Sequence, residues 1–134
     1  MQNKIAKLRT IRILFVEDEE ELCKIIGDTL SKLQANFETA NNGAVALEKL
    51  KEKNDYDLVV TDINMPVMNG LELIAAIRDD LKCDIPVIIM SAHTEPEYIK
   101  SAEELGVKNY LLKPFDFIKF INLVYELEFN KKIL

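Results

Sequence analysis

Residues 11–18 read IRILFVED, a short β-rich run that ends in two consecutive acids. Its apolar part, 11–16, has the length and composition of a strand buried on both faces of a sheet. From residue 19 to residue 33, apolar side chains recur at three- and four-residue spacing, which predicts an amphipathic helix. Alternation of such strands and helices is typical of a parallel α/β sheet.

The same alternation recurs along the rest of the chain. Further strands are predicted at 36–40, 57–61, 86–90 and 107–112, each followed by a helical pattern, the last of them at 115–129. Five βα units predict an α/β fold of the doubly wound type, a three-layer sandwich with helices on both faces of a parallel five-stranded sheet. We therefore expect an N-terminal tail at 1–10, one domain at 11–130 and a short C-terminal end at 131–134.

Composition narrows the function classes. Among 134 residues, 17 Lys and Arg face 23 Asp and Glu, a formal net charge of −6. Nucleic acid and anionic membranes attract clustered cations, so we expect direct binding to neither. The longest apolar run, 13–16, is far shorter than the ~20 residues that span a bilayer. Cys23 and Cys83 form no CxxC pair, and we expect free thiols in a reducing cytoplasm.

Polar side chains gather where the predicted strands end. Ligands of open α/β sheets bind outside the carboxyl ends of the strands. Glu17 and Asp18 follow the first strand, Asp62 the third, Ser91 the fourth and Lys113 the fifth. We expect these side chains to share one edge of the sheet. Taken alone, Lys113 could be a solvated surface lysine and Ser91 a turn residue. The prediction of a site therefore depends on all of these side chains following strand ends.

The loop after the first strand indicates the kind of ligand. This loop, residues 16–20, contains four consecutive acids and no glycine, so its backbone N–H groups cannot approach a nucleotide phosphate closely. Converging carboxylates resist ionising together, and a hard divalent cation relieves that repulsion. Oxygen ligands favour Mg²⁺ over Zn²⁺. In the alternative reading, Glu17 and Asp18 merely favour the start of the following helix.

With a metal bound, Asp62 could act as a nucleophile on phosphorus. A divalent cation neutralises phosphoryl charge in such reactions. Lys113 would neutralise a second phosphoryl oxygen, and the Ser91 hydroxyl would donate to a third. The predicted reaction class is therefore phosphoryl transfer to a carboxylate.

These motifs resemble a known family. The acidic pair at 17–18, the pattern D-x-x-M-P-x-x-x-G from Asp62 to Gly70, Ser-Ala at 91–92 and Lys-Pro-Phe at 113–115 stand in the order and spacing of response-regulator receiver domains. The chain is similar to the chemotaxis-regulator type of this two-component signalling family from residue 11 to about 130. The resemblance implies a flavodoxin-like sheet in the order 2-1-3-4-5.

The resemblance also implies a role for each acid. Asp62 would accept phosphate from a phosphohistidine of a sensor histidine kinase or phosphotransfer protein. Asp18 would bind Mg²⁺ directly, Glu17 through water, and the backbone carbonyl of Asn64 would complete the protein ligands. Asn64 and His93 would also flank the phosphoryl group and tune its lifetime.

A second set of implied roles concerns switching. Ser91 would be the switch hydroxyl, Tyr110 the aromatic that turns inward on activation, and the Lys113–Pro114 bond would be cis. The face formed by the fourth helix, fifth strand and fifth helix would change shape. Two alternatives stay open at this point: a fixed, half-buried Tyr110 with its hydroxyl in water, and an exposed loop histidine at position 93.

The predicted function is a phosphoaccepting switch that catalyses only its own phosphorylation and dephosphorylation. Expected partners are a kinase, a downstream protein or a C-terminal output domain, and a second copy forming a homodimer through the switching face. The apolar 115–129 helix fits a wide buried stripe or such a contact surface. Rival readings are a haloacid dehalogenase-type phosphohydrolase, whose second acid is replaced by Asn64, and a pseudo-receiver that never accepts phosphate.

Overall fold

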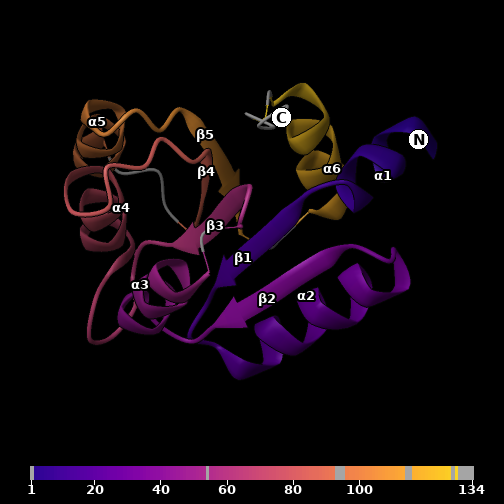
Figure 1. The fold of residues 1–134 in the computed structure, drawn as a ribbon, viewed down its shortest axis with the longest axis horizontal. Coiled ribbons are helices and arrows are strands. Elements are labelled where there is room, and N and C mark those ends of the chain that lie inside the picture. The colour runs from indigo at the N-terminus through magenta and orange to yellow at the C-terminus, as the bar shows by residue number, and fades with distance from the viewer. Residues whose placement is uncertain (1, 54, 93–95, 114–115, 128, 130–134) are drawn as a thin grey trace.

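The computed structural model describes residues 2–53, 55–92, 96–113, 116–127 and 129. Helices and strands alternate along the chain (Figure 1). The strands are β1 (Arg12–Val16), β2 (Asn36–Ala40), β3 (Leu58–Asp62), β4 (Val87–Ser91) and β5 (Asn109–Leu112). The helices are α1 (Gln2–Arg9), α2 (Glu20–Lys32), α3 (Gly43–Glu52), α4 (Gly70–Asp79), α5 (Pro96–Glu104) and α6 (Phe117–Glu126).

The five strands form one parallel sheet in the order β2-β1-β3-β4-β5, which confirms the predicted fold. Figure 1 shows α3, α4 and α5 on one side of the sheet and α2 and α6 on the other. The order reverses direction between β1 and β3, so the loops after these two strands leave the sheet as neighbours. That crevice is where an open α/β sheet binds its ligand.

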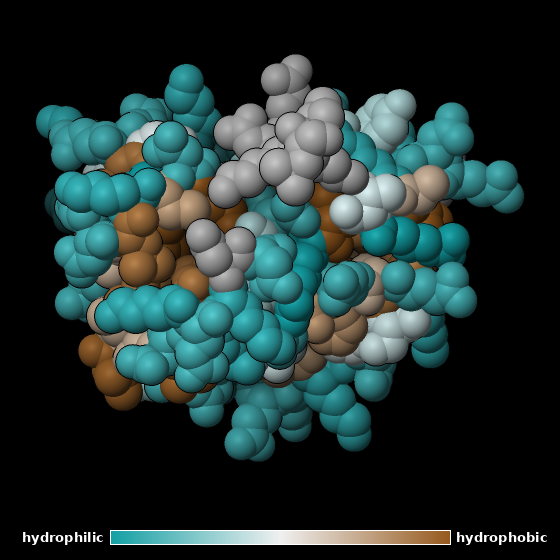
Figure 2. Space-filling view, viewed as in Figure 1, coloured by the Kyte–Doolittle hydropathy of each residue, from teal (hydrophilic) through white to brown (hydrophobic). Residues whose placement is uncertain are grey.

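Two apolar cores hold the layers together. One fills the space under α3, α4 and α5 and includes Leu14, Val59 and Ile89; the other lies under α2 and α6 and includes Phe15, whose ring centroid lies 5.6 Å from that of Phe120. Strands β3 and β4 are buried at every position, as expected of strands covered on both faces. On the outside, hydrophilic side chains cover most of the face in Figure 2, with apolar patches between them.

Side-chain caps fix where the helices at the ligand-binding edge begin. Asn42 accepts a hydrogen bond from Val45 N (2.9 Å) at the start of α3. Asn69 and Glu72 form a reciprocal capping box at the start of α4, with bonds of 2.8 and 3.0 Å. These caps fix the first residues of α3 and α4 and so set the length of the loops before them.

Several predicted boundaries shift. Strands three and four run one residue later than expected, so Asp62 and Ser91 are the last residues of β3 and β4 rather than the first residues after them. The fifth strand begins at Asn109 instead of 107, and the last helix ends at Glu126 instead of 129. Among the described residues, no helix has both the length and the apolarity needed to cross a membrane.

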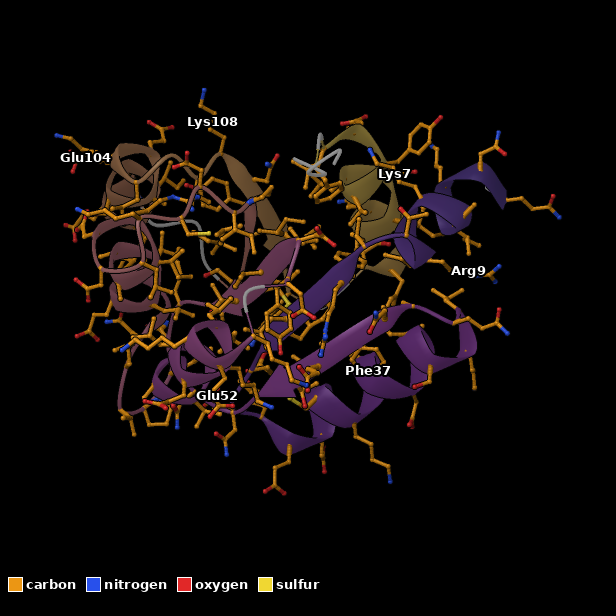
Figure 3. All side chains as sticks on the ribbon, in the orientation of Figure 1. Lys7, Arg9, Phe37, Glu52, Glu104 and Lys108 are labelled. Carbon is orange, nitrogen blue, oxygen red and sulfur yellow. The ribbon has the colours of Figure 1, made fainter. Side chains whose placement is uncertain are left out.

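The largest departure is at the N-terminus, where the expected tail contains helix α1. Leu8 is fully buried in the core under α6. The Lys7 ammonium donates to the carbonyls of Tyr125 (2.6 Å) and Leu127 (2.5 Å), carbonyls at the C-terminal end of α6 that the helix itself leaves without partners. Figure 3 labels Lys7 where α1 and α6 lie side by side. Residues 2–9 therefore form part of the folded structure.

This packing predicts that Leu8→Ala lowers the free energy of unfolding by about 2–5 kcal/mol, because the change leaves a cavity in a closed core. Urea denaturation followed by circular dichroism measures the effect. Asn3→Ala, at an exposed position of the same helix, should change stability by less than about 0.5 kcal/mol. Equal stabilities of wild type and Leu8→Ala would show that α1 does not dock in solution.

Candidate functional site

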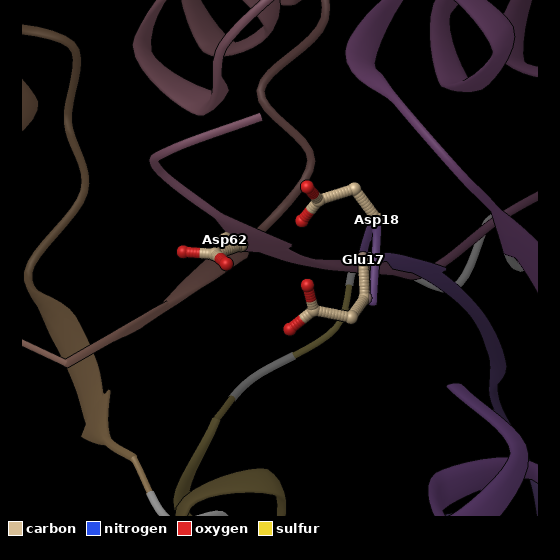
Figure 4. A group of neighbouring side chains, drawn as sticks. All are labelled: Glu17, Asp18 and Asp62. Carbon is tan, nitrogen blue, oxygen red and sulfur yellow. The ribbon is translucent and has the colours of Figure 1, made fainter. Parts of the chain in front are cut away.

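Three carboxylates converge at the carboxyl edge of the sheet. Glu17 and Asp18 follow β1 directly, and Asp62 ends β3, the strand beside it. One carboxylate oxygen from each lies within 4.8 Å of the others. Figure 4 shows the three side chains, which come from two neighbouring strand ends. The sheet topology thus brings together acids that are 44 or 45 positions apart in the sequence.

Glu17 is the most buried of the three, with an exposed fraction of 0%. Its Oε2 accepts a bond from Glu19 N at 3.3 Å, whereas its Oε1 has no well-directed hydrogen bond within the described residues. Burial raises the pKa of Glu17 to about 7, and the neighbouring charge of Asp62 adds to this rise. A buried carboxylate that shares the Lys113 ammonium with Asp62 would be stabilised further by another cation.

The Lys113 ammonium is the cation that the structure places among these acids. Its Nζ lies 2.7 Å from Glu17 Oε1, 2.7 Å from Asp62 Oδ2 and 3.7 Å from Glu19 Oε1. Burial lowers the pKa of Lys113, but the hydrogen bonds and charges of Asp62 and Glu17 outweigh it and raise the pKa above its ordinary value. Lys113 is therefore charged, and its single charge faces at least two buried carboxylates.

Asp62 is held at both oxygens. Oδ1 accepts a bond from Ile63 N at 2.7 Å, and Oδ2 accepts one from Lys113 Nζ at 2.7 Å. The residue is 6% exposed, so its carboxylate is oriented and still reachable from the rim. A carboxylate held in one orientation is suited to nucleophilic attack. Because two further acids lie beside it, a metal ion or another positive charge would have to accompany the electrophile.

The residues present fit a divalent cation of the Mg²⁺ class. The donor set is oxygen only, the three carboxylates are close enough to share one ion, and the buried Glu17 carboxylate shares the Lys113 ammonium with Asp62. Lys113 alone leaves the cluster with an excess of negative charge. The set resembles an Mg²⁺ site and not a zinc site, which would call for His or Cys ligands.

The other predicted site residues are Ser91, Asn64, Tyr110 and His93. Ser91 is buried at the end of β4, where its carbonyl accepts a bond from Lys113 N at 2.9 Å. Asn64 is exposed in the loop that follows Asp62. Tyr110, on β5, is partly buried and its hydroxyl donates to Ile99 O in α5 at 3.2 Å, instead of pointing into water. His93 and Pro114, and with Pro114 the predicted cis bond, lie outside the described residues.

Sequence reasoning missed the backbone contacts behind this site. Gly70 N donates to Ile63 O at 2.8 Å, and Gly43 N donates to Met68 O at 3.2 Å, so both glycines contact the loop that follows Asp62. Gly43 has a local signal, since it follows two asparagines, but that signal indicates only a turn. Glu19 Oε1 also lies 3.7 Å from Lys113 Nζ, a contact that no local pattern in the sequence indicates.

Comparison with known proteins agrees with this geometry. The family model described as "Response regulator receiver domain" matches residues 13–125. The chain belongs to this family. Receiver domains are signalling switches and not turnover enzymes, which sets aside the dehalogenase-type alternative.

Relatives of this receiver occur in bacteria and plants. It is 39% identical over 105 residues to "Two-component response regulator ARR10" of Arabidopsis thaliana, covering 78% of this chain and 19% of that protein. It is 38% identical over 109 residues to "Chemotaxis protein CheY-3" of Vibrio cholerae, covering 80% and 83%. The chain thus spans about a fifth of the plant regulator and most of the bacterial one.

A solved structure gives the same picture of the fold. The crystal structure of the CheX-CheY-BeF3-Mg+2 complex from Borrelia burgdorferi contains a chain that matches this receiver with a TM-score of 0.77 and 28% identity, covering 85% of this chain and 86% of that one. Helix α1 precedes the region that the family model matches.

The Glu17 pKa predicts how the stability of the metal-free receiver depends on pH. Folded Glu17 holds its proton up to about pH 7, against an ordinary value of 4.5. The folded state then binds more protons than the unfolded state, so this contribution is fully present below pH 4.5 and is lost as pH rises through about 7. Glu17→Gln, which stays neutral, should flatten that decline.

Urea denaturation in EDTA between about pH 4.5 and about pH 8 measures the slope. Glu19→Gln is the matched control, because the Glu19 side chain is 65% exposed, and it should keep the wild-type slope. The burial argument is wrong if Glu17→Gln and wild type lose stability in parallel.

Proposed function

We propose that this receiver accepts a phosphoryl group on Asp62 from a histidine kinase or a phosphotransfer protein, with Mg²⁺ bound at the acidic cluster. The observation that carries the proposal is the fixed Asp62 carboxylate, held by Ile63 N and Lys113 Nζ and flanked by Glu17 and Asp18. Receiver domains as a family interact with such kinases. The Borrelia protein named with BeF3 and Mg+2 supports the same chemistry by similarity.

In the proposed reaction, one Asp62 carboxylate oxygen attacks phosphorus and the P–N bond to the donor imidazole breaks. The electron pair goes to the imidazole nitrogen, which takes up a proton, and an acyl phosphate remains on Asp62. Lys113 stays beside the new phosphoryl oxygens and offsets their charge. Hydrolysis of the acyl phosphate by water returns the carboxylate, so the chain modifies only itself.

Mg²⁺ would be held by Asp18 and Asp62, through water by Glu17, and by the main-chain carbonyl of Asn64. When bound, the ion neutralises the negative charge that accumulates as phosphorus changes partners. Glu17 is the acid that this neutralisation would stabilise most, since its exposed fraction is 0%. Asn64 and His93 are proposed to set the phosphoryl lifetime.

The proposed switch links Ser91 to Tyr110. Phosphorylation adds roughly −1.5 to −2 charges at the sheet edge. The Ser91 hydroxyl would donate to a phosphoryl oxygen, and Tyr110 would turn inward, exchanging its bond to Ile99 O in α5 for a position nearer Ser91. Since that bond joins β5 to α5, its loss would change the face made by α5, β5 and α6.

This face carries large exposed apolar side chains, namely Leu112 on β5 and Ile118 on α6, which are 55% and 61% exposed. We propose it as the surface for a downstream protein, an output domain or a second copy of the chain. The cytoplasmic location and the lack of direct nucleic-acid binding, both expected from the sequence, stay predictions.

Asp62→Asn should abolish incorporation of acid-stable, base-labile phosphate from acetyl phosphate and Mg²⁺, because an amide cannot form the acyl phosphate. Radiolabelling or intact-mass measurement detects the modification. Asp84→Asn removes an exposed carboxylate before β4 and should label like wild type. Persistent labelling of Asp62→Asn would refute the nucleophile assignment, and an unlabelled wild type would favour the pseudo-receiver alternative.

Asp18→Ala should weaken Mg²⁺ binding by roughly tenfold or more, since it removes a charged oxygen ligand. Isothermal titration calorimetry gives the dissociation constant. The control is Asp28→Ala, an exposed acid later in α2, which should leave that constant within about twofold of wild type. An unchanged titration of Asp18→Ala would remove this residue from the metal ligands.

A further inference from the structure

The connection between β2 and α3 touches both loops that carry the acids. Ala40 O, at the end of β2, accepts a bond from Glu17 N at 3.0 Å. Three residues later, Gly43 N donates to Met68 O at 3.2 Å, in the loop that follows Asp62. Segment 40–43 therefore bridges the two halves of the acidic cluster by main-chain bonds, although it contributes no charged side chain to the cluster.

The bridge depends on a close approach that only glycine permits. A Cβ atom added at Gly43 would lie 2.6 Å from Met68 O and 2.9 Å from Met68 Cγ. Gly43 is also the first residue of α3, and the Asn42 cap fixes the start of that helix. The segment cannot step back from Met68 without disturbing the cap, so an added side chain would push the Met68 loop outward.

At its other end, the same loop is anchored beside Asp62. Gly70 N donates to Ile63 O at 2.8 Å, and a Cβ atom added at Gly70 would lie 2.2 Å from Asp62 O. The loop carrying Asn64 thus has two anchors, one at Gly70 next to the β3 end and one at Gly43 on a neighbouring connection.

Between the anchors the backbone is strained. Val67 has φ of 70° and is 82% exposed, and Met68 N donates to Pro66 O at 2.8 Å across it. A β-branched residue is costly in the left-handed region, and such a conformation persists only where the surroundings enforce it. Val67 itself is exposed and packs on little, so the anchors on either side have to hold it.

We propose that segment 40–43 is a brace that sets the spacing between Glu17–Asp18 and Asp62–Asn64, and that Gly43 is a positioning residue for the divalent cation. A metal site needs its ligands at fixed separations, and here the ligands come from two loops that leave the sheet independently. The brace joins those loops by one hydrogen bond on each side. This inference rests on the proposed Mg²⁺-dependent phosphorylation.

The test compares Gly43→Ala with three controls by titrating Mg²⁺ alone in a calorimeter. Gly43→Ala should raise the Mg²⁺ dissociation constant by roughly tenfold. Its phosphorylation by acetyl phosphate should slow at limiting Mg²⁺ and recover at saturating Mg²⁺. Gly27→Ala is the glycine control, because its added Cβ meets only the Phe37 ring at ordinary distances of 3.6 and 3.7 Å. Ile26→Val lowers stability on the opposite face of the sheet.

Met68→Ala is the third control. It keeps the carbonyl that Gly43 N contacts and removes only side-chain atoms, so it should bind Mg²⁺ within about twofold of wild type. The double variant Gly43→Ala/Met68→Ala relieves the Cγ contact, retains the carbonyl contact, and should show the weakened binding of Gly43→Ala. If Gly43→Ala alone does not fold, the Mg²⁺ affinity of the double variant shows whether Gly43 positions the metal ligands.

Wild-type Mg²⁺ affinity in Gly43→Ala, or in the double variant, would overturn the brace. So would equal weakening in Met68→Ala or Ile26→Val, which would trace the effect to packing or general stability. If wild type itself neither binds Mg²⁺ nor accepts phosphate, the proposed function fails and the brace fails with it, an outcome distinct from a normal wild type with an unaffected Gly43→Ala.

Discussion

The receiver depends on one ammonium placed among buried carboxylates. Lys113 Nζ lies 2.7 Å from both Glu17 and Asp62, and without it two acids at the sheet edge would lie close together with little water to screen them. Lys113 does not neutralise the cluster completely, since its one positive charge faces several acids. Lys113 therefore holds Glu17 and Asp62 in place, and the remaining negative charge is left for a dication to neutralise.

Topology explains why so few residues suffice. In a parallel sheet with the order β2-β1-β3-β4-β5, the ends of β1 and β3 are neighbours, so any acids there converge whatever their distance in sequence. Topology does not set the exact separation between the loop after β1 and the loop after β3. Main-chain contacts at Gly43 and Gly70 supply that precision, and they need glycine because backbone meets backbone. Side chains therefore supply the chemical groups of the site, whereas backbone contacts set the distances between them.

This division also explains what the sequence could predict. The parallel sheet, the shared edge and the convergence of Glu17, Asp18, Asp62 and Lys113 follow from apolar runs with polar ends, which are local signals, whereas the strand order comes from the family resemblance. Helix α1 could not be predicted, because an isolated helix of eight residues is marginal in water and forms only through docking on α6, at the far end of the chain. The Gly43 contact was missed for the same reason: its partner is in another loop, and a glycine gives no sign of what lies against it.

Two glutamates, Glu38 on β2 and Glu17 just after β1, show which charges are structural and which are available for chemistry. Glu38 accepts hydrogen bonds from the Tyr56 hydroxyl and from Arg12, and the pKa of Glu38 falls below its ordinary value, chiefly through the tyrosine. The Glu38 side chain is 31% exposed, so water also solvates its carboxylate, and the carboxylate stays charged. Glu17 is fully buried, and its pKa moves the other way, to about 7. A carboxylate that is buried with few hydrogen-bond donors therefore indicates the ligand-binding end of the sheet better than the number of acids does, because a bound cation would stabilise its charge.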